Sequence, residues 1–243
     1  GASSGIGEAL ALEYAAPGVH LVLTGRNEAR LNEVVTRCSD LGATVNAAKI
    51  DVTDQSAMAE LIQQTEQTQP LDLLIANAGI SGGSGGSGED EAQARAIFDV
   101  NFTGVINTIW PAITAMKSRK CGHIAMVSSM AGMTPQPGAP AYSASKAAVK
   151  AYGEALNGSL REDGITVTTI CPGFVKSRIT DQNDFPMPMF MDAPKAARII
   201  RRGLAKGRIS IYFPWRLAAI VWLISVLPPS WRVALLTRMP KKG

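Results

Sequence analysis

Short apolar runs alternate with longer amphipathic segments along most of this 243-residue chain, and no other feature restricts the fold as strongly. Runs such as 20–24, 123–127 and 165–170 are largely apolar at successive positions, which is typical of strands buried on both faces. Segments such as 28–41 and 141–161 place apolar residues at helical spacing. Strands and helices that alternate in this way form parallel β-α-β units. We therefore expect an α/β fold, a doubly wound parallel sheet with helices on both faces.

The predicted elements extend over most of the first 170 residues. They are strands at 20–24, 44–50, 71–76, 123–127 and 165–170, and helices at 8–14, 28–41, 55–67, 91–119 and 141–161. The long segment 91–119 contains Pro111, and a proline bends or interrupts a helix. A chain of this length with 46% hydrophobic residues can bury one large core. We therefore predict a single domain over residues 1–243.

The charges are distributed unevenly along the chain. Residues 1–192 carry a net charge of −7, whereas residues 193–243 carry +11 and contain no acidic residue. A segment with one sign of charge indicates an anionic surface nearby. We expect no nucleic-acid partner, because the body of the chain is acidic.

The cysteines and histidines are few and scattered. Cys38, Cys121 and Cys171 lack the spacing of metal ligands, so we interpret them as small apolar residues in a reducing compartment. His20 and His123 each begin a predicted strand, away from the strand ends where ligands bind in such folds. We expect no metal site and a cytoplasmic location.

The chain opens with a glycine-rich turn directly before a helix, and such turns bind phosphates. Glycines let the backbone approach a pyrophosphate at the helix N-terminus, and two serines add hydroxyl donors. The predicted contacts are Gly1, Ser3, Ser4, Gly5, Ile6 and Gly7. A turn of this kind follows a strand, yet no residue precedes Gly1. We therefore expect this chain to lack the first, central strand of the sheet.

A tyrosine and a lysine, Tyr142 and Lys146, lie one helical turn apart and so on the same side of a predicted helix. A phenol has a pKa near ~10 and exchanges protons poorly at neutral pH, but a neighbouring cation lowers that pKa. Ser129 lies thirteen residues before Tyr142, after a predicted strand, and its hydroxyl can polarise a carbonyl oxygen. Ser128 is the alternative hydroxyl, but the spacing favours Ser129.

These motifs together resemble the short-chain dehydrogenase/reductase family. The motifs that occur in the family's order and spacing are Gly1–Gly7, Asn77-Ala-Gly79, Asn101, Ser129, Tyr142, Lys146 and Pro172-Gly173. The resemblance covers about residues 1–180. It implies a nicotinamide-dependent oxidoreductase on a Rossmann-type sheet, and by analogy a homodimer or homotetramer.

The end of the second family strand distinguishes the two nicotinamide cofactors. An acidic residue there binds the ribose 2′-hydroxyl, but this chain has Arg26, whose guanidinium can hold a phosphate. We predict NADP(H) in preference to NAD(H); the alternative is a solvent-exposed arginine without such a role. The resemblance adds further cofactor contacts at Asp51, Val52, Asn77, Ala78, Gly79, Tyr142, Lys146, Pro172, Gly173, Val175 and Ser177. Ser177 stands where the family pattern has threonine and keeps the hydroxyl.

The resemblance also implies catalytic roles. Tyr142 is the general acid or base, Lys146 lowers its pKa and binds the nicotinamide ribose, and Ser129 orients the substrate oxygen. Asn101 resembles the helix asparagine that organises a water relay behind the lysine; alternatively, it hydrogen-bonds its own backbone. The predicted reaction interconverts a carbonyl and a secondary alcohol. The alternatives are a non-catalytic nucleotide-binding sensor or scaffold, and an epimerase, for which this chain leaves little room.

The family places a substrate lid at residues 180–208, and here this segment is rich in methionine and phenylalanine between Phe185 and Met191. Such side chains suit an adaptable apolar pocket, so we expect a hydrophobic carbonyl or alcohol substrate. A second segment of unusual composition lies earlier in the chain. Residues 81–88 contain only glycine and serine, which predicts a flexible loop.

The basic C-terminal extension, residues 209–243, contains three tryptophans and the apolar run 217–227. Eleven residues are too few to span a bilayer. Tryptophans with flanking arginines and lysines suit a helix that lies at a membrane surface. The alternatives are a cover for the substrate pocket and a subunit interface.

Overall fold

The computed structural model describes residues 1–82, 89–181 and 187–237. The elements, in chain order, are α1 (Gly5–Tyr14), β1 (His20–Gly25), α2 (Glu28–Asp40), β2 (Thr44–Lys49), α3 (Gln55–Thr68), β3 (Leu73–Ala76), α4 (Glu91–Phe98), the π-helical turn η1 (Asp99–Thr103), α5 (Gly104–Arg119), β4 (Gly122–Val127), the 3-10 turn η2 (Met130–Gly132), α6 (Pro140–Ser159), β5 (Ile165–Pro172), α7 (Ala193–Ala205), β6 (Ser210–Phe213), α8 (Trp215–Ser225) and α9 (Pro229–Leu236). Residues 83–88 of the predicted flexible loop, and residues 185–186 of the methionine-rich segment, lie outside the described residues.

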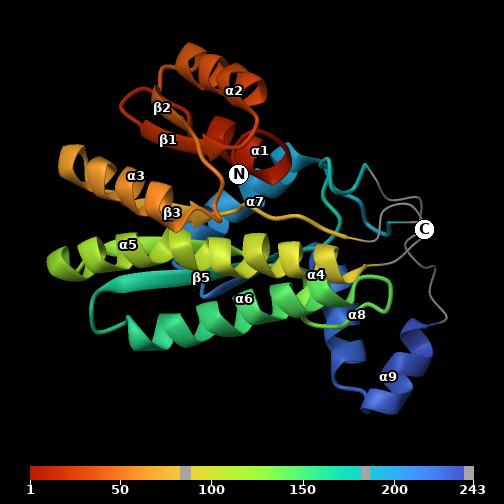
Figure 1. Ribbon diagram of the computed structural model, residues 1–243. Helices are drawn as coiled ribbons and strands as arrows, with labels where there is room; N and C mark the ends of the chain where they lie inside the picture. Colours follow the sequence, from red (N-terminus) through yellow and green to blue (C-terminus); the bar gives the residue numbers. More distant parts are fainter. Residues whose placement is uncertain (83–88, 182–186, 238–243) are drawn as a thin grey trace.

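The strands are parallel and form two sheets (Figure 1). One sheet pairs β1 with β2, and the other has the order β3-β4-β5-β6. Between β1 and β3 lies a groove of about 420 Å³ that also borders Gly1. The groove separates the two sheets, and the expectation of a further strand in the sheet stays a prediction.

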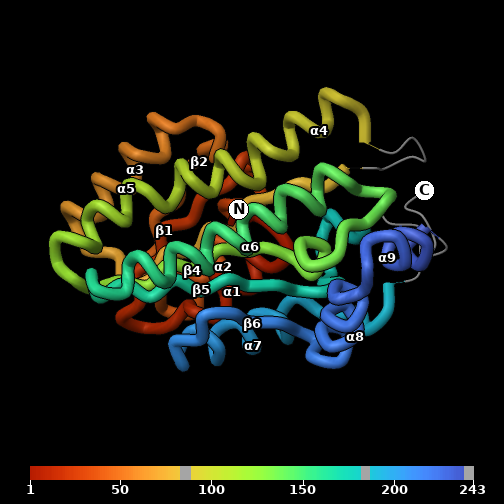
Figure 2. The backbone as a smooth tube through the Cα atoms, turned by 90° about the horizontal axis from the view of Figure 1, so that it is seen from below, coloured from red at the N-terminus to blue at the C-terminus, as the bar shows by residue number. Residues whose placement is uncertain are grey.

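Helices cover both faces of the sheet, as predicted, because neighbouring residues of a strand point to opposite sides. In β4, Ile124 and Met126 pack in a core with α3, α5 and α6, whereas Ala125 and Val127 pack in a second core with α1 and α7. A third core joins α1 and α2 to β1. Figure 2 shows α5 and α6 on one side of β4 and β5, and α7 on the other. The doubly wound α/β fold is thus confirmed.

The predicted helix 91–119 is interrupted, but not at its proline. The break is the π-helical turn η1, whereas Pro111 lies inside the continuous helix α5. A π-helical turn inserts one extra residue and often marks a functional position. Here it contains Asn101, whose side chain is fully buried and hydrogen-bonded to residues outside the helix. An interruption of the helix at Pro111 is therefore wrong, whereas a bend at this proline stays a prediction.

Two elements of the last fifty residues differ from the sequence-based expectation. Ser210–Phe213 is a strand, β6, that pairs with β5; four residues were too few to reveal it by pattern. Residues Ala193–Ala205 of the predicted lid region form the helix α7, whose apolar face packs in the second core and whose Arg201 bonds Glu13 of α1. Of the described residues at 180–208, only Thr180 borders the cleft described below.

All parallel strands end at the same edge, so the residues that follow them gather there. Arg26 follows β1, Asp51 lies two residues beyond β2, and Asn77 follows β3. Ser129 lies two residues beyond β4, and Gly173 follows β5. This edge of the sheet carries the candidate site.

Candidate active site

A cleft of about 600 Å³ lies at this edge of the sheet and gathers the predicted site residues. Its lining includes Gly1, Ser3, Ser4, Gly5, Ile6, Arg26, Asp51, Val52, Asn77, Ala78, Gly79, Ser129, Tyr142, Lys146, Pro172, Gly173, Val175 and Ser177. Gly7 and Asn101 are not in the lining and lie behind it. The cleft therefore brings together residues from both halves of the chain.

The glycine-rich turn is tightly packed, which explains its composition. A Cβ atom on Gly7 would lie 2.0 Å from the carbonyl oxygen of Gly1, so no side chain fits there. Gly5 has φ +59°, a left-handed conformation that favours glycine. The Asn77 side chain donates a hydrogen bond of 2.8 Å to the Gly1 carbonyl. The turn thus places the start of α1 against the strand end after β3.

The nucleotide end of the cleft carries two arginines. The Arg26 guanidinium lies 3.6 Å from the Asp51 carboxylate, and both side chains are solvent-exposed. Partial burial raises the pKa of Asp51, but hydrogen bonds from Thr53 and the nearby Arg26 outweigh it and hold that pKa below its ordinary value. Arg30 also lines the cleft, and its Nε is a buried nitrogen without a hydrogen-bond partner among the described residues.

Arg30 was not predicted from the sequence. Its position follows from Asn27, which caps α2 by accepting a 2.9 Å hydrogen bond from the Arg30 backbone N–H. The cap places Arg30 in the first turn of α2, beside the cleft. Two guanidinium groups and a glycine-rich helix N-terminus suit the phosphates of a dinucleotide.

The catalytic end of the cleft brings together Ser129, Tyr142 and Lys146. Ser129 is close enough to Tyr142 to lower the pKa of the phenol, against the effect of burial. The Lys146 Nζ lies 5.9 Å from the centre of the Tyr142 ring and donates a 2.9 Å hydrogen bond to the Val127 carbonyl. The tyrosine and lysine are therefore on the same side of the cleft, as one turn of α6 requires.

The pKa values at this end differ from the sequence-based expectation. Burial raises the pKa of Tyr142, and the hydrogen bond from Ser129 only partly offsets this effect. Burial also lowers the pKa of Lys146 to about 8, although the nearby Cys171 raises it slightly. Lys146 therefore does not lower the Tyr142 pKa below its ordinary value in this structure, because the amine is bonded to the Val127 carbonyl instead.

Asn101 connects the cleft wall to the tyrosine helix. Its side-chain amide accepts from the Ile80 N–H at 2.8 Å and donates to the Ile80 carbonyl at 2.9 Å. It also donates to the Ser145 hydroxyl at 3.1 Å, which in turn donates to the Tyr142 carbonyl at 2.8 Å. The amide thus bonds distant residues, not its own backbone, as the alternative interpretation supposed.

Further residues hold the tyrosine helix and were missed by the sequence analysis. The Glu89 carboxylate accepts hydrogen bonds from the backbone N–H groups of Ala141 (2.5 Å) and Tyr142 (3.2 Å). It therefore satisfies donors at the N-terminus of α6, where a negative charge is stabilising. Ser128 donates to the Lys146 carbonyl at 2.6 Å, so it is a structural neighbour of the site and not the second hydroxyl. The Glu89 contact could not be predicted from local sequence patterns, because about fifty residues separate Glu89 from Ala141 and Tyr142.

The segment after β5 forms the wall opposite the glycine-rich turn. A Cβ atom on Gly5 would lie 2.9 Å from the Ser177 Cβ, so the two segments approach closely. Thr180 fixes this wall, because its hydroxyl accepts from the Ser177 N–H at 2.8 Å and donates to the Val175 carbonyl at 3.1 Å. The sequence analysis had assigned no role to Thr180.

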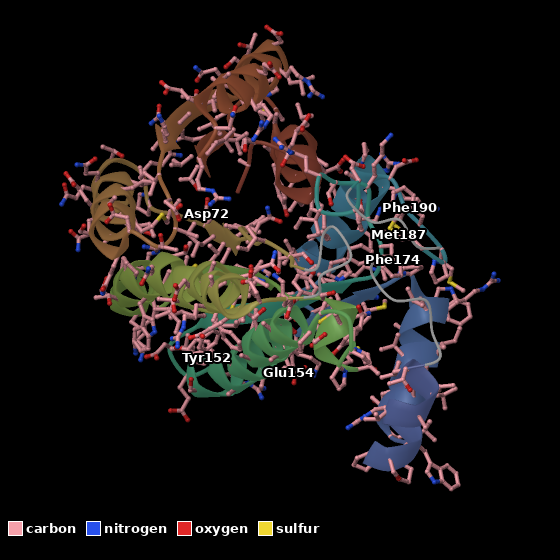
Figure 3. The ribbon with its side chains drawn as sticks, turned by 45° about the vertical axis from the view of Figure 1, so that its right-hand side comes forward. Asp72, Tyr152, Glu154, Phe174, Met187 and Phe190 are labelled. Carbon is pink, nitrogen blue, oxygen red and sulfur yellow. The ribbon has the colours of Figure 1, made fainter. Side chains whose placement is uncertain are left out.

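Apolar side chains lie beside this wall. Residues 187–191 run alongside 174–176, with hydrogen bonds between Met191 and both Phe174 and Lys176. Figure 3 shows Phe174, Met187 and Phe190 near one another at this side of the molecule. Phe190 and Met189 are exposed. The described part of the methionine-rich segment thus presents apolar side chains beside the wall that follows β5.

The histidines and cysteines lie elsewhere. His20 bonds Gln69 and His123 bonds Thr168, and burial lowers the pKa of His123. Cys38, Cys121 and Cys171 are free thiols. In the part of the chain that the structure describes, no cluster of histidine, cysteine and carboxylate side chains has the arrangement of a metal site.

Comparisons with known proteins agree with this geometry. A family model described as short chain dehydrogenase matches residues 1–185. An uncharacterized oxidoreductase of Myxococcus xanthus is 39% identical over 229 residues, which cover 94% of this chain and 90% of that protein. The resemblance identified from the sequence motifs is thereby confirmed.

Solved structures share the fold. A short-chain dehydrogenase from Sphingobium yanoikuyae in complex with NADPH has a TM-score of 0.82 at 24% identity, and the match covers 100% of this chain and 95% of that chain. A short chain dehydrogenase from Mycobacterium paratuberculosis bound to NAD has a TM-score of 0.76 at 23% identity, over 87% and 93% of the two chains. Proteins that share this fold have therefore been solved with NADPH bound and with NAD bound.

Proposed function

Since this chain belongs to the short-chain dehydrogenase/reductase family and is a nicotinamide-dependent oxidoreductase of CH–OH groups, we propose that it uses NADP(H) to interconvert a hydrophobic carbonyl compound and its secondary alcohol. The observation that carries this proposal is the gathering of Ser129, Tyr142 and Lys146 at one end of a cleft whose other end holds Arg26. The alternative of a non-catalytic sensor or scaffold is set aside, because the family assignment makes the chain an enzyme.

Tyr142 is the proposed proton donor in carbonyl reduction. It is half-buried in the cleft, whose lining it shares with Ser129, so a carbonyl oxygen between the two hydroxyl groups would accept hydrogen bonds from both. The phenol proton then passes to the substrate oxygen, which becomes the alcohol hydroxyl. The bound cofactor supplies the hydride that the carbonyl carbon gains. In alcohol oxidation, the tyrosinate takes the same proton back.

Lys146 has the role of keeping positive charge beside the tyrosinate. With a pKa of about 8, it is mostly protonated at neutral pH despite its burial. If the amine exchanged its bond to the Val127 carbonyl for one to a ribose hydroxyl of the bound cofactor, its charge would oppose the effect of burial on the Tyr142 pKa. Asn101 positions this pair through Ser145.

The preference for NADP(H) depends on the arginine end. The two solved relatives bind NADPH and NAD respectively, so they leave both cofactors open. Arg26 replaces the acidic residue that binds a 2′-hydroxyl, and the unpartnered Nε of Arg30 adds a second donor near it. Both features favour a 2′-phosphate.

The hydrophobic substrate is inferred from the apolar residues Phe174, Met187, Met189 and Phe190, because residues 187–191 run alongside residues 174–176 of the cleft wall.

A homodimer or homotetramer is proposed by analogy with the family, in which long helices such as α5 and α6 often pair across a subunit interface. Three free cysteines are consistent with a reducing compartment such as the cytoplasm.

The test is NADPH oxidation with a panel of ketones that includes long-chain, polycyclic and small polar members. We expect turnover with apolar ketones, and a higher kcat/KM with NADPH than with NADH. Equal or better turnover of small polar ketones would refute the substrate class, and a preference for NADH would refute the cofactor. No turnover of any carbonyl or alcohol, with cofactor binding retained, would refute the proposed reaction.

A further inference from the structure

Helices α8 and α9 expose an apolar surface, which we call the α8–α9 face. Its large apolar residues are Trp215, Ile220, Trp222, Leu223, Val226, Trp231, Val233 and Leu235. The three tryptophans are 71%, 56% and 68% exposed. Single exposed apolar residues are common, but a contiguous apolar patch of this extent marks an interaction surface.

The composition of α8 differs from that of an ordinary surface helix. Its inward side packs Leu217 against the body of the protein, and its outward side carries Trp215, Trp222 and Val226, which share one stripe of the helix. In contrast, the outward side of α7 is charged, with Arg198 and Arg202 exposed. A helix that is apolar all round requires an apolar environment on its outer side as well.

This environment is not the interior of a bilayer that the helix crosses. Eleven residues of helix extend about 16 Å, whereas the hydrocarbon core is about 30 Å thick. None of the helices among the described residues is long and apolar enough to cross a membrane. Helix α8 therefore fits an orientation along a surface.

The positive charge of this face favours a negatively charged partner. Among the described residues of this region, 209–237, the charged side chains are Arg216 and Arg232, and none is acidic. The Arg216 guanidinium lies 5.5 Å from the centre of the Trp215 ring, so a cation and an aromatic ring are presented together. A second copy of this surface would be repelled by the like charge, whereas an anionic lipid surface attracts it. Tryptophan is also enriched at the level of lipid headgroups.

The α8–α9 face lies next to the catalytic end of the cleft. Leu217 packs on Gly173, where a Cβ atom would lie 2.8 Å from the leucine Cδ2. The Thr134 hydroxyl, five residues after Ser129, donates to the Val221 carbonyl at 3.3 Å. Figures 1 and 2 both show α8 and α9 at the end of the molecule where α4 begins, beyond the carboxyl ends of the strands. Docking of this face would bring the catalytic end near the surface that it binds.

We propose that the α8–α9 face docks on an anionic lipid surface, and that the enzyme takes apolar carbonyl substrates from that membrane. The second part rests on the proposed function, whereas the docking does not. The tryptophans insert among the headgroups, and the arginines contact the lipid phosphates.

Flotation with vesicles tests the docking. One set contains equal parts phosphatidylcholine and phosphatidylglycerol, and the other contains phosphatidylcholine alone. We expect the protein to bind the anionic vesicles and to bind the neutral ones much more weakly. Trp222→Ser and Trp231→Ser should each weaken binding about tenfold, and Arg216→Gln about fivefold. The matched control is Trp110→Ser, because Trp110 is a 49% exposed tryptophan of α5, outside the face, and it should leave vesicle binding unchanged.

Several results would overturn the docking. They are equal binding to both vesicle types, no binding by the wild type, or unchanged binding after both tryptophan substitutions. If those substitutions instead dissociate an oligomer in sedimentation while vesicle binding persists, the face is a subunit interface. Thermal melting shows whether each variant is folded; if Trp222→Ser is not, Trp231→Ser alone decides, because α9 lies at the outer end of the molecule (Figure 1).

The substrate route has a separate readout. With a water-insoluble ketone dissolved in anionic vesicles, Trp231→Ser should lower kcat/KM, whereas with a water-soluble ketone and no vesicles it should equal the wild type. Loss with both ketones would indicate a cover over the pocket and would overturn the route. Normal turnover of soluble ketone shows that the proposed reaction stands even if the docking fails.

Discussion

At the nucleotide end of the cleft, Arg26 and Asp51 face each other at 3.6 Å with 61% and 40% of their side chains exposed. At the catalytic end, Lys146 is only 4% exposed and has no carboxylate partner among the described residues, only the Val127 carbonyl. Water screens the first pair, and such exposed pairs contribute little to stability. The buried amine is not screened, and its pKa falls to about 8.

This contrast in exposure suggests that the two ends of the cleft have different tasks. The exposed end is proposed to select the cofactor, and its residues can be exchanged without great cost to the fold. The buried end is proposed to perform proton transfer, and the Lys146 amine there is held by a hydrogen bond to the Val127 carbonyl. Substitutions at the two ends should therefore change different measured quantities.

The largest effect is expected for Tyr142→Phe. This variant keeps the ring and its packing but removes the proton donor, so kcat should fall by about 10² to 10⁴-fold. Affinity for NADPH, measured by fluorescence titration, should change little, because the phosphate-binding end is untouched. A kcat within a few-fold of the wild type would show that another group transfers the proton.

Arg26→Asp should change the preference for NADPH over NADH, not proton transfer. Loss of a charge-assisted hydrogen bond and a new repulsion should lower kcat/KM for NADPH by about 10 to 100-fold, whereas kcat/KM for NADH should be unchanged or higher. The matched control is Arg161→Asp, because Arg161 is exposed in the turn before β5 at the opposite edge of the sheet. An equal loss with both cofactors would contradict a specific role for Arg26 at the 2′-phosphate.

Lys146→Met tests how much the buried charge of Lys146 lowers the free energy of unfolding. Because burial lowers the pKa from 10.5 to about 8, the folded state binds this proton less tightly than the unfolded state. Below pH 8 both states are protonated, and the full cost is present. As the pH rises from 8 to 10.5, the folded amine loses its proton first and the cost is relieved.

The free energy of unfolding of the wild type, measured by urea denaturation, should therefore rise relative to that of Lys146→Met across this window. The expected gain is on the order of 3 kcal/mol. The exposed Lys206→Met serves as the control. A difference between wild type and Lys146→Met that is independent of pH would show that the buried amine carries no such cost.

Glu89→Gln should have the smallest effect. The variant keeps one oxygen for the two N–H groups at the start of α6 but loses the negative charge. We expect a loss of about 1 kcal/mol in stability and a small decrease in kcat, because Tyr142 is one of the two capped residues. A melting temperature equal to that of the wild type would contradict this role.

Local patterns predicted most of the fold and the cleft. Apolar runs revealed β1 to β5, and glycine spacing revealed a turn in which Gly7 has no room for a side chain. Contacts between distant residues were not predictable in this way. Glu89 meets Tyr142 across more than fifty residues, and the pKa of Tyr142 depends on burial that no local motif encodes.

The interruption of helix 91–119 shows the same limit. Local propensity placed the break at Pro111, but the break is at η1 because Asn101 bonds the backbone of Ile80 and the hydroxyl of Ser145. Tertiary hydrogen bonds determined the position, and a proline inside α5 was tolerated. The strand β6 was missed because its four residues are defined by pairing with β5.

The most direct test of a single dinucleotide cleft with two different ends is a crystal structure with NADPH. We expect the 2′-phosphate within hydrogen-bond distance of Arg26 and the nicotinamide ring beside Tyr142, with Lys146 bonded to the adjacent ribose. A nicotinamide bound away from Tyr142, or a 2′-phosphate without contact to Arg26 or Arg30, would contradict this assignment of the two ends.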